Sequence, residues 1–331
     1  MKEEIFEASL TPEAIKQLRG HQTSEGENIA GSPPGRSITA MKEPFFDNER
    51  MWSLLHGSYD IHQHSGPSST TQRLYDELDL AIQGCDMEQG GIVFKNHDTP
   101  TTRSVVLVQK VVNKWAEEHH KKKIELYSGV TLNHSVGGLN PDAVIAAYRL
   151  GGKYVWMPSL DANHQRRVMG QQEDGIDLID ENDKVVPELK EILALMAETD
   201  MILGLCHQST RERVMVVREA VRMGIQRIEI NDANFPMTKL TPEQAKMFAD
   251  NGAYIGIYAL DLTTGFSWDE VMAIYKAVGP ERIVLASDCG HIVWPLPIDA
   301  MRRFILGFLL RGVPDKDVNL MCKINAHNLL H

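Results

Sequence analysis

The feature that most constrains the fold is a regular alternation of short apolar runs with amphipathic stretches, which begins at residue 59. The apolar runs span residues 59–64, 91–97, 124–133, 154–159, 201–208, 227–232, 254–260 and 282–288. The stretches between them repeat apolar residues with the helical period, and many end in glycine, a common helix terminator. Continuous apolar strands joined by helices are typical of a parallel sheet, and eight such units predict an α/β fold of the (β/α)8 (TIM) barrel type. The alternative is a doubly wound open sheet, but no glycine-rich phosphate-binding fingerprint follows the first run.

Two segments fall outside this alternation. Residues 1–50 combine a short capped helical pattern, LTPEAIKQL, with a stretch rich in glycine, serine and proline. We therefore expect an N-terminal helix and arm over residues 1–50 and the barrel over residues 51–331. After the fourth apolar run, GIDLIDENDKVV has the pattern of two short strands around a polar turn. This pattern predicts a small β-hairpin that stands over the C-terminal mouth of the barrel.

Composition limits the partners and the compartment. The net charge of −11 argues against nucleic acid and against an anionic membrane surface, which leaves a small-molecule substrate. The four cysteines form no CxxC pair, which is typical of a reducing compartment. The N-terminal residues lack an apolar signal core, and no run approaches the ~20 apolar residues of a membrane span. We expect a cytoplasmic protein, and the arm together with the apolar segment 301–312 favours a homo-oligomer.

Histidines and carboxylates gather where the predicted strands end, and in such barrels the active site lies at that end. The first run ends with His62 and His64, two residues apart and so on the same face of a strand. The second ends with Lys95 and His97, the fifth with His207, and the eighth with Asp288. We expect four further residues to contact a substrate, namely Asn231, His164, His291 and Arg73. An arginine suits a planar anion such as a carboxylate.

Three neutral imidazoles and one carboxylate form a ligand set that suits Zn²⁺, and also Mn²⁺ or Fe²⁺. Such an ion lowers the pKa of a bound water to ~7, which makes it a nucleophile at neutral pH. Asp288 is expected to take the proton of that water as general base. The alternation of side chains along a strand predicts that Cys206 and Cys289 point away from the pocket, toward the helices.

The sequence resembles the amidohydrolase superfamily of metal-dependent barrel hydrolases. The matching motifs are DIHQH in the first strand, CHQS in the fifth and ASDCGH in the eighth, and the resemblance covers roughly residues 55–331. Several further segments, among them GIVFKNHDTPT and VWMPSLDANH, resemble a poorly characterised bacterial branch of the superfamily. The resemblance implies that His62, His64, His207 and Asp288 are the metal ligands.

Two departures from the superfamily pattern concern a second metal ion. The place of its sixth-strand histidine holds Asn231, and the fourth strand offers neither a lysine nor a glutamate at its C-terminal end. Lys95 is the one lysine expected at the mouth. It is either carboxylated and bridges two ions, or a free ammonium that binds a substrate anion. We expect one tightly bound ion, with two as the alternative.

The reaction expected from these residues is metal-dependent hydrolysis of an amide, cyclic amide or ester of a small molecule. Lys95 and His97 are expected to assist Asp288 in catalysis. A metal-dependent decarboxylase or lyase on the same scaffold is the first alternative, and a non-catalytic binding barrel is the second.

Overall fold

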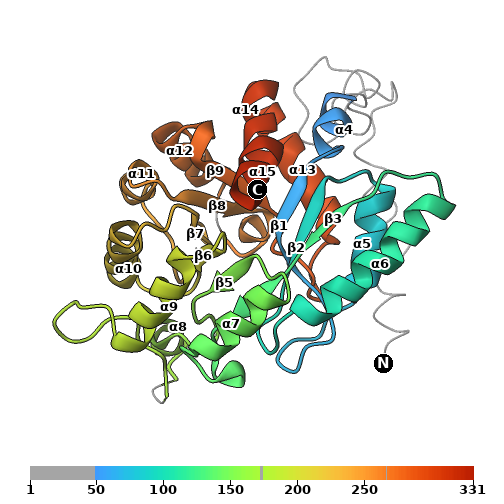
Figure 1. Ribbon diagram of the computed structural model, residues 1–331. Helices are drawn as coiled ribbons and strands as arrows, with labels where there is room; N and C mark the ends of the chain where they lie inside the picture. Colours follow the sequence, from blue (N-terminus) through green and yellow to red (C-terminus); the bar gives the residue numbers. More distant parts are fainter. Residues whose placement is uncertain (1–48, 172–173, 266) are drawn as a thin grey trace, which may run out of the picture. The chain divides into compact units, whose positions relative to one another are not determined.

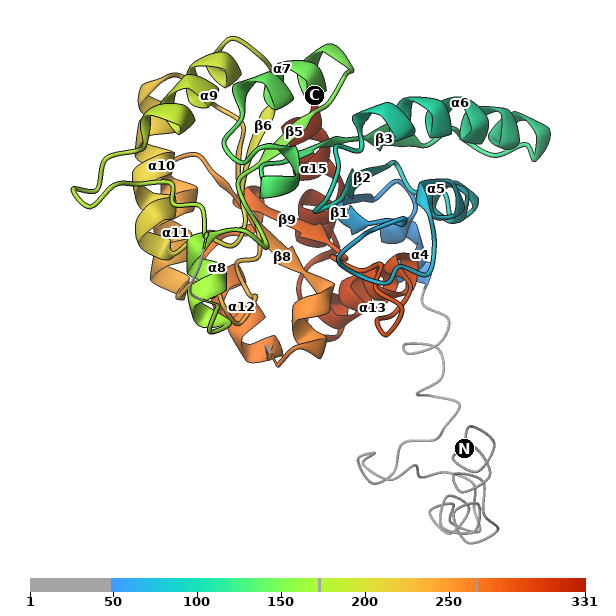
Figure 2. The same ribbon diagram turned by 90° about the horizontal axis from the view of Figure 1, so that it is seen from below.

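The computed structural model describes residues 49–331 apart from residues 172–173 and 266. The strands are β1 (Tyr59–His64), β2 (Gly91–Lys95), β3 (Glu125–Tyr127), β4 (Gly129–Thr131), β5 (Tyr154–Trp156), β6 (Ile202–Leu205), β7 (Ile228–Ile230), β8 (Tyr254–Tyr258) and β9 (Ile283–Ala286). The helices are α4 (Glu49–Leu55), α5 (Glu77–Asp86), α6 (Thr102–Glu118), α7 (Pro141–Arg149), α8 (Asn163–Val168), α9 (Pro187–Ala197), α10 (Thr210–Arg222), α11 (Pro242–Asp250), α12 (Trp268–Val278), α13 (Pro297–Leu310), α14 (Asp315–Asn319) and α15 (Asn325–Leu330). Figures 1 and 2 show the helices arranged around the strands.

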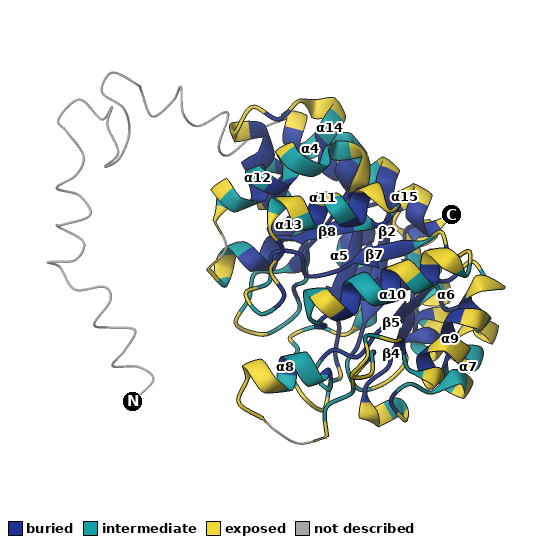
Figure 3. Ribbon diagram, turned by 90° about the vertical axis from the view of Figure 1, so that its left-hand side faces the viewer, coloured by how far each residue is buried: buried dark blue, intermediate teal, exposed yellow. Residues whose placement is uncertain are grey.

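The strands pair in parallel throughout, in the orders β1-β2-β3 and β4-β5-β6-β7-β8-β9. Only Ser128 separates β3 from β4, so these two segments are the halves of one bent strand that pairs with β2 on one side and β5 on the other. Every one of the eight predicted strands is present, and the predicted (β/α)8 barrel is confirmed. The strands are buried, and the exposed residues lie on the outward faces of the surrounding helices (Figure 3).

The ring closes between β9 and β1 through the residues that follow β9. Ser287 N donates to the Asp60 carboxylate at 2.9 Å, and Asp288 N donates to His62 O at 2.9 Å. His64 N in turn donates to Cys289 O at 2.9 Å. This ladder holds residue 288 directly beside the end of β1.

A β-bulge interrupts β1 and determines which residues face the barrel interior. The register with β2 shifts by one residue between Asp60 and Gln63. Tyr59 and Ile61 belong to the interior apolar cluster, and His62, the residue directly after Ile61, faces the same interior. A bulge reverses the alternation of side chains, and it commonly lies next to an active site.

The floor of the barrel is filled by the C-terminal helix. Leu329 and Leu330 of α15 pack in one cluster with Tyr59, Tyr154 and Trp156 from the strands. The C-terminal helix runs beside β1 in Figure 1. The interior is therefore sealed at the N-terminal ends of the strands and can open only at their C-terminal ends.

The predicted hairpin after the fourth strand forms, with an antiparallel bridge between Ile179 and Val185. It packs against the start of α10, where Leu178 N donates to Glu212 Oε1 at 3.3 Å and Arg211 pairs with Asp183. The predicted N-terminal helix and arm lie outside the described residues except for positions 49 and 50. Within the described part of the chain, no helix has both the length and the hydropathy needed to cross a membrane.

Gly290 lies where the closing ladder passes β1, with φ of +140°. A Cβ there would overlap the His64 carbonyl oxygen, so Gly290→Ala should destabilise the protein by at least ~3 kcal/mol. Gly224→Ala is the matched control, because Gly224 also has positive φ (+91°) but has no atom within 4 Å of the added Cβ. We expect the control to cost only about 1 kcal/mol in urea unfolding. Equal losses in the two variants would contradict the role given to Gly290.

Candidate metal centre

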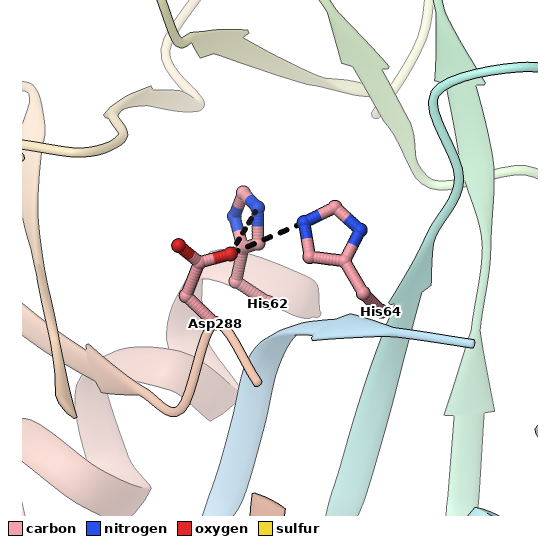
Figure 4. A group of neighbouring side chains, drawn as sticks. All are labelled: His62, His64 and Asp288. Atoms are coloured by element: carbon pink, nitrogen blue, oxygen red, sulfur yellow. Dashed lines mark ion pairs between the residues drawn. The ribbon is translucent and has the colours of Figure 1, made fainter. Parts of the chain in front are cut away.

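The end of β1 and the second residue after β9 bring two imidazoles and one carboxylate together (Figure 4). His64 Nε2 lies 3.1 Å from Asp288 Oδ1, and His62 Nε2 lies 3.5 Å from the same oxygen. One ligand atom from each of the three residues lies within 4.8 Å of the other two. Ligands bound to zinc at about 2.0–2.1 Å in tetrahedral geometry are about 3.3 Å apart, so the observed spacing fits a metal ion.

Asp288 adopts the left-handed backbone conformation, with φ of +53°. Strain of this kind in a residue other than glycine is retained where the surroundings fix it, and it gathers at functional sites. Burial raises the pKa of Asp288 to about 7, while the charges of Lys95 and Arg73 lower it. A carboxylate held without a cation at this depth is costly, and a bound cation removes that cost.

The imidazoles are available as ligands because they are neutral. Burial lowers the pKa of both His62 and His64 well below the usual value. His64 Nδ1 is buried and has no hydrogen-bond partner among the described residues. A neutral ring with an unshared nitrogen is the form that binds a metal ion.

Tyr258 orients the ring of His62. Its hydroxyl donates to Glu229 Oε1 at 2.8 Å, and His62 Nδ1 lies 3.1 Å from the hydroxyl oxygen. A proton on Nδ1 would be donated to that oxygen and would leave the lone pair of His62 on Nε2, which faces Asp288. Hydrogen bonds of this kind commonly orient metal ligands.

Asn231 belongs to this supporting network. It is fully buried, and its Nδ2 donates to the Tyr258 hydroxyl at 2.6 Å. Tyr154 donates to the other oxygen of Glu229 at 2.9 Å. We expected Asn231 to contact substrate, but the structure places it beneath His62, where it holds Tyr258.

Lys95 lies against His62 and is almost fully buried. Its Nζ is 3.2 Å from His62 Nε2 and 3.4 Å from Cys206 Sγ. It also lies 5.8 Å from the centre of the Trp156 ring. The prediction that Cys206 points toward the helices is wrong: β6 ends at Leu205, and Cys206 faces the barrel interior. Cys289 does not line the cavity among the described residues, as expected.

The opposite wall carries a second histidine–carboxylate pair. His207 Nε2 lies 3.6 Å from Asp232 Oδ2, and Asp232 also has positive φ, at +55°. Burial lowers the pKa of His207 to about 4, although Asp232 raises it. His97 stacks on His64 with a ring-centre distance of 4.7 Å and its Nδ1 is 2.8 Å from Ser159 Oγ. His207 thus faces the same space as the cluster formed by His62, His64 and Asp288 but lies outside it.

These groups surround a cavity of about 260 Å³, which we call the central cavity. It is lined by His62, His64, Thr71, Arg73, Lys95, His97, Leu160, Gln165, His207, Asp232, Phe235, Leu260, Thr264, Asp288, His291 and Trp294. A larger cavity of about 660 Å³ lies near α15 and includes Arg227 and Leu329, but none of the cluster residues, so volume does not identify the site.

Arg73 and His291 both line the central cavity, and they are joined by an antiparallel bridge. His164 does not: its Nε2 lies 2.9 Å from Met237 O, and it lines a separate cavity with the hairpin. No described hairpin residue lines the central cavity, so the hairpin stands beside the mouth rather than over it. The central cavity is lined there by Leu160, from the loop between β5 and α8, and by Gln165, from α8.

Sequence reasoning missed Glu229, the aromatic wall of Phe235 and Trp294, and the contribution of Asp232. A charged residue inside the apolar run RIEIND was the available signal for Glu229. Such a residue is fully buried only when it is hydrogen-bonded. Phe235 and Trp294 come from loops, where no periodicity indicates which way a side chain points.

The fold is that of the amidohydrolase barrels. An amidohydrolase from Pseudomonas aeruginosa is 15% identical with a TM-score of 0.55, over 85% of this chain and 98% of its own. The probable dipeptidase PvdM from Pseudomonas aeruginosa is 11% identical with a TM-score of 0.57, over 86% and 98%. Amidohydrolase 2 from Bifidobacterium longum subsp. infantis is 13% identical with a TM-score of 0.50, over 82% and 98%. The predicted resemblance to this superfamily is confirmed at the level of the fold.

Within that class of barrels, the chain belongs to DUF6282, a family of unknown function, whose model matches residues 57–256. No curated protein matches the chain.

The buried Glu229 gives stability a measurable pH dependence. Burial raises its pKa from 4.5 to about 7, although the hydrogen bonds from Tyr258 and Tyr154 lower it. The folded state therefore holds a proton that the unfolded state has lost, and stability falls as the pH rises from about 4.5 to about 7. Glu229→Gln should reduce this slope by up to about 1.4 kcal/mol per pH unit in urea unfolding at pH 5, 6 and 7. The exposed Glu188→Gln is the control, and a slope in Glu229→Gln equal to that of the wild type would refute the assignment.

Proposed function

We propose that this protein is a metal-dependent hydrolase that acts on an amide, cyclic amide or ester bond of a small molecule. The observation that carries the proposal is the convergence of His62, His64 and Asp288 on one point at the C-terminal ends of β1 and β9. This convergence lies in a cavity of about 260 Å³, just below the ~300 Å³ at which typical ligand pockets begin, so it suits a compact substrate.

The metal, with Zn²⁺ the best match to the ligand types, would be held by His62, His64 and Asp288, with His207 approaching from β6. When bound, it supplies Lewis acidity and lowers the pKa of water. Asp288 lines the cavity, and its carboxylate can take a proton from the attacking water and pass it to the leaving group. His97, stacked on His64, and Asp232, beside His207, border the same space and can hydrogen-bond the reacting group.

The lining favours a substrate with an anionic group and an apolar body. Arg73 reaches the cavity, its Nη2 donates to Thr71 Oγ1 at 3.3 Å, and its buried Nε has no partner among the described residues. Phe235, Leu260 and Trp294 supply an apolar wall. A free donor on a guanidinium beside such a wall suits a carboxylate or phosphate on a compact molecule.

A decarboxylase on the same scaffold is the second candidate, favoured by the two cations, Arg73 and Lys95, that border one cavity. Both can bind a carboxylate that is then lost. The product separates the two reactions, since hydrolysis yields two fragments containing the elements of water and decarboxylation releases carbon dioxide. A panel of amides, lactones and aromatic carboxylates, each followed by mass spectrometry, makes this distinction.

The first test is metal content per chain by elemental analysis, on protein grown with added zinc or manganese. We expect about one ion in the wild type, its loss in His62→Ala, and its retention in Lys95→Ala. His164→Ala is the control, because His164 lies outside the central cavity, and it should keep the ion. About two ions that fall to one in Lys95→Ala would make Lys95 a bridging ligand. A wild type without metal would overturn the proposal and leave a binding barrel.

Arg73 provides the test of substrate class. With the best substrate from the panel, Arg73→Gln should raise KM by about 10- to 100-fold, as expected for the loss of one hydrogen bond between charged groups. The exposed Arg103→Gln should leave KM unchanged. An effect of Arg73→Gln on kcat alone would show that Arg73 does not bind the ground-state substrate.

A further inference from the structure

A second cluster of metal-ligating side chains lies at the opposite end of the barrel from the central cavity. His327 lies in the last turn of α15, and His331 directly follows the helix. His331 N donates to His327 O at 2.9 Å, so the helical turn continues to His331 and both side chains lie on one face. Glu125 is the first residue of β3 and faces them. One ligand atom from each of these three residues lies within 4.8 Å of the other two. We call this set the floor cluster.

The contacts within the floor cluster resemble those of a coordination sphere. His331 Nε2 lies 3.4 Å from Glu125 Oε2, and the rings of His327 and His331 are 4.2 Å apart. The first distance is close to the separation of two ligand atoms in a tetrahedral zinc site, about 3.3 Å. All three side chains are exposed, so the remaining coordination positions are open to water.

Two tyrosines orient the carboxylate. Tyr59 and Tyr127 both donate to Glu125 Oε2, at 2.8 and 2.9 Å. Tyr127 OH also lies 2.8 Å from His331 Nε2, a hydrogen bond that an ion bound at this nitrogen would replace. Glu125 is thus held in one orientation before any ion arrives, which reduces the entropy lost on binding.

The helix adds a favourable field. The C-terminus of a helix carries a partial negative charge, and a cation placed there is stabilised. Two histidines at positions i and i+4 with a carboxylate from another element are a ligand set of borderline divalent ions such as Zn²⁺.

We propose that Glu125, His327 and His331 form a second site for a zinc-type divalent cation, which fastens α15 to β3. Leu329 and Leu330 of the same helix fill the barrel floor, so an ion bound here stabilises the interior of the barrel. This site is separate from the proposed reaction, because β1 begins with Tyr59 at the floor and ends with His64 at the central cavity.

The test uses the full chain without a histidine tag and in a His62→Ala/His64→Ala background, which removes the central site. Zn²⁺ is the probe, measured by titration calorimetry and by thermal unfolding. We expect one ion per chain and a rise in Tm of at least about 3 °C at zinc concentrations well above Kd. Co²⁺ in place of Zn²⁺ should give visible absorption bands of a site with nitrogen ligands.

In the same background, His327→Gln and His331→Gln should each lose the zinc-dependent rise in Tm. Both side chains are exposed, so these variants should fold. The control is His119→Gln. His119 is exposed, directly follows α6 and lies outside the floor cluster. A zinc response in His327→Gln equal to that of the background, or no response in the background itself, would overturn the proposal. Neither result would affect the reaction proposed for the central cavity.

Discussion

The hydrogen-bond ladder that joins the residues after β9 to β1 is the constraint on which the rest of the structure depends. Asp288 N donates to His62 O and His64 N donates to Cys289 O, both at 2.9 Å. The backbone segments that close the barrel thus also carry the side chains of His62, His64 and Asp288. Barrel closure and ligand placement cannot vary independently. Positive φ at Asp288 is the local cost of turning its carboxylate toward the imidazoles.

Above the floor of the barrel, the interior side chains form successive layers, and each layer positions the side chains of the next. Leu329 and Leu330 of α15 support Tyr154 and Trp156, whose rings stack at 4.7 Å. The Tyr154 hydroxyl then donates to Glu229, which also accepts from Tyr258. A carboxylate in an apolar interior is destabilising by itself. The hydrogen-bond donors to Glu229 offset part of that cost. The resulting chain of hydrogen bonds ends at His62 Nδ1 and orients the imidazole ring.

The sequence predicted the eight strands, and it predicted that His62, His64 and Asp288 meet, because parallel strands share one C-terminal edge. It could not predict the bulge in β1, since periodicity assumes an unbroken strand. Alternation likewise failed for Cys206, because β6 ends one residue earlier. The predictions that His164 and Asn231 contact a substrate failed for a different reason. The end of a strand indicates which edge of the barrel a residue occupies, but not how far it lies from the central cavity.

The position of Lys95 bears on how many ions the proposed site would hold. Its Nζ lies 3.2 Å from His62 Nε2. A lone pair on that nitrogen can accept a hydrogen bond from Lys95 or bind a metal ion, but not both. Under the proposed function, an ion at His62 would therefore displace the ammonium, whose charge Asp232 and Asp288 on the two walls also stabilise. As an ammonium, Lys95 would disfavour a second cation. As a carbamate, it would carry the opposite charge at the same place and favour one. In the proposed site, the protonation chemistry of this single side chain would thus couple metal stoichiometry to the reaction.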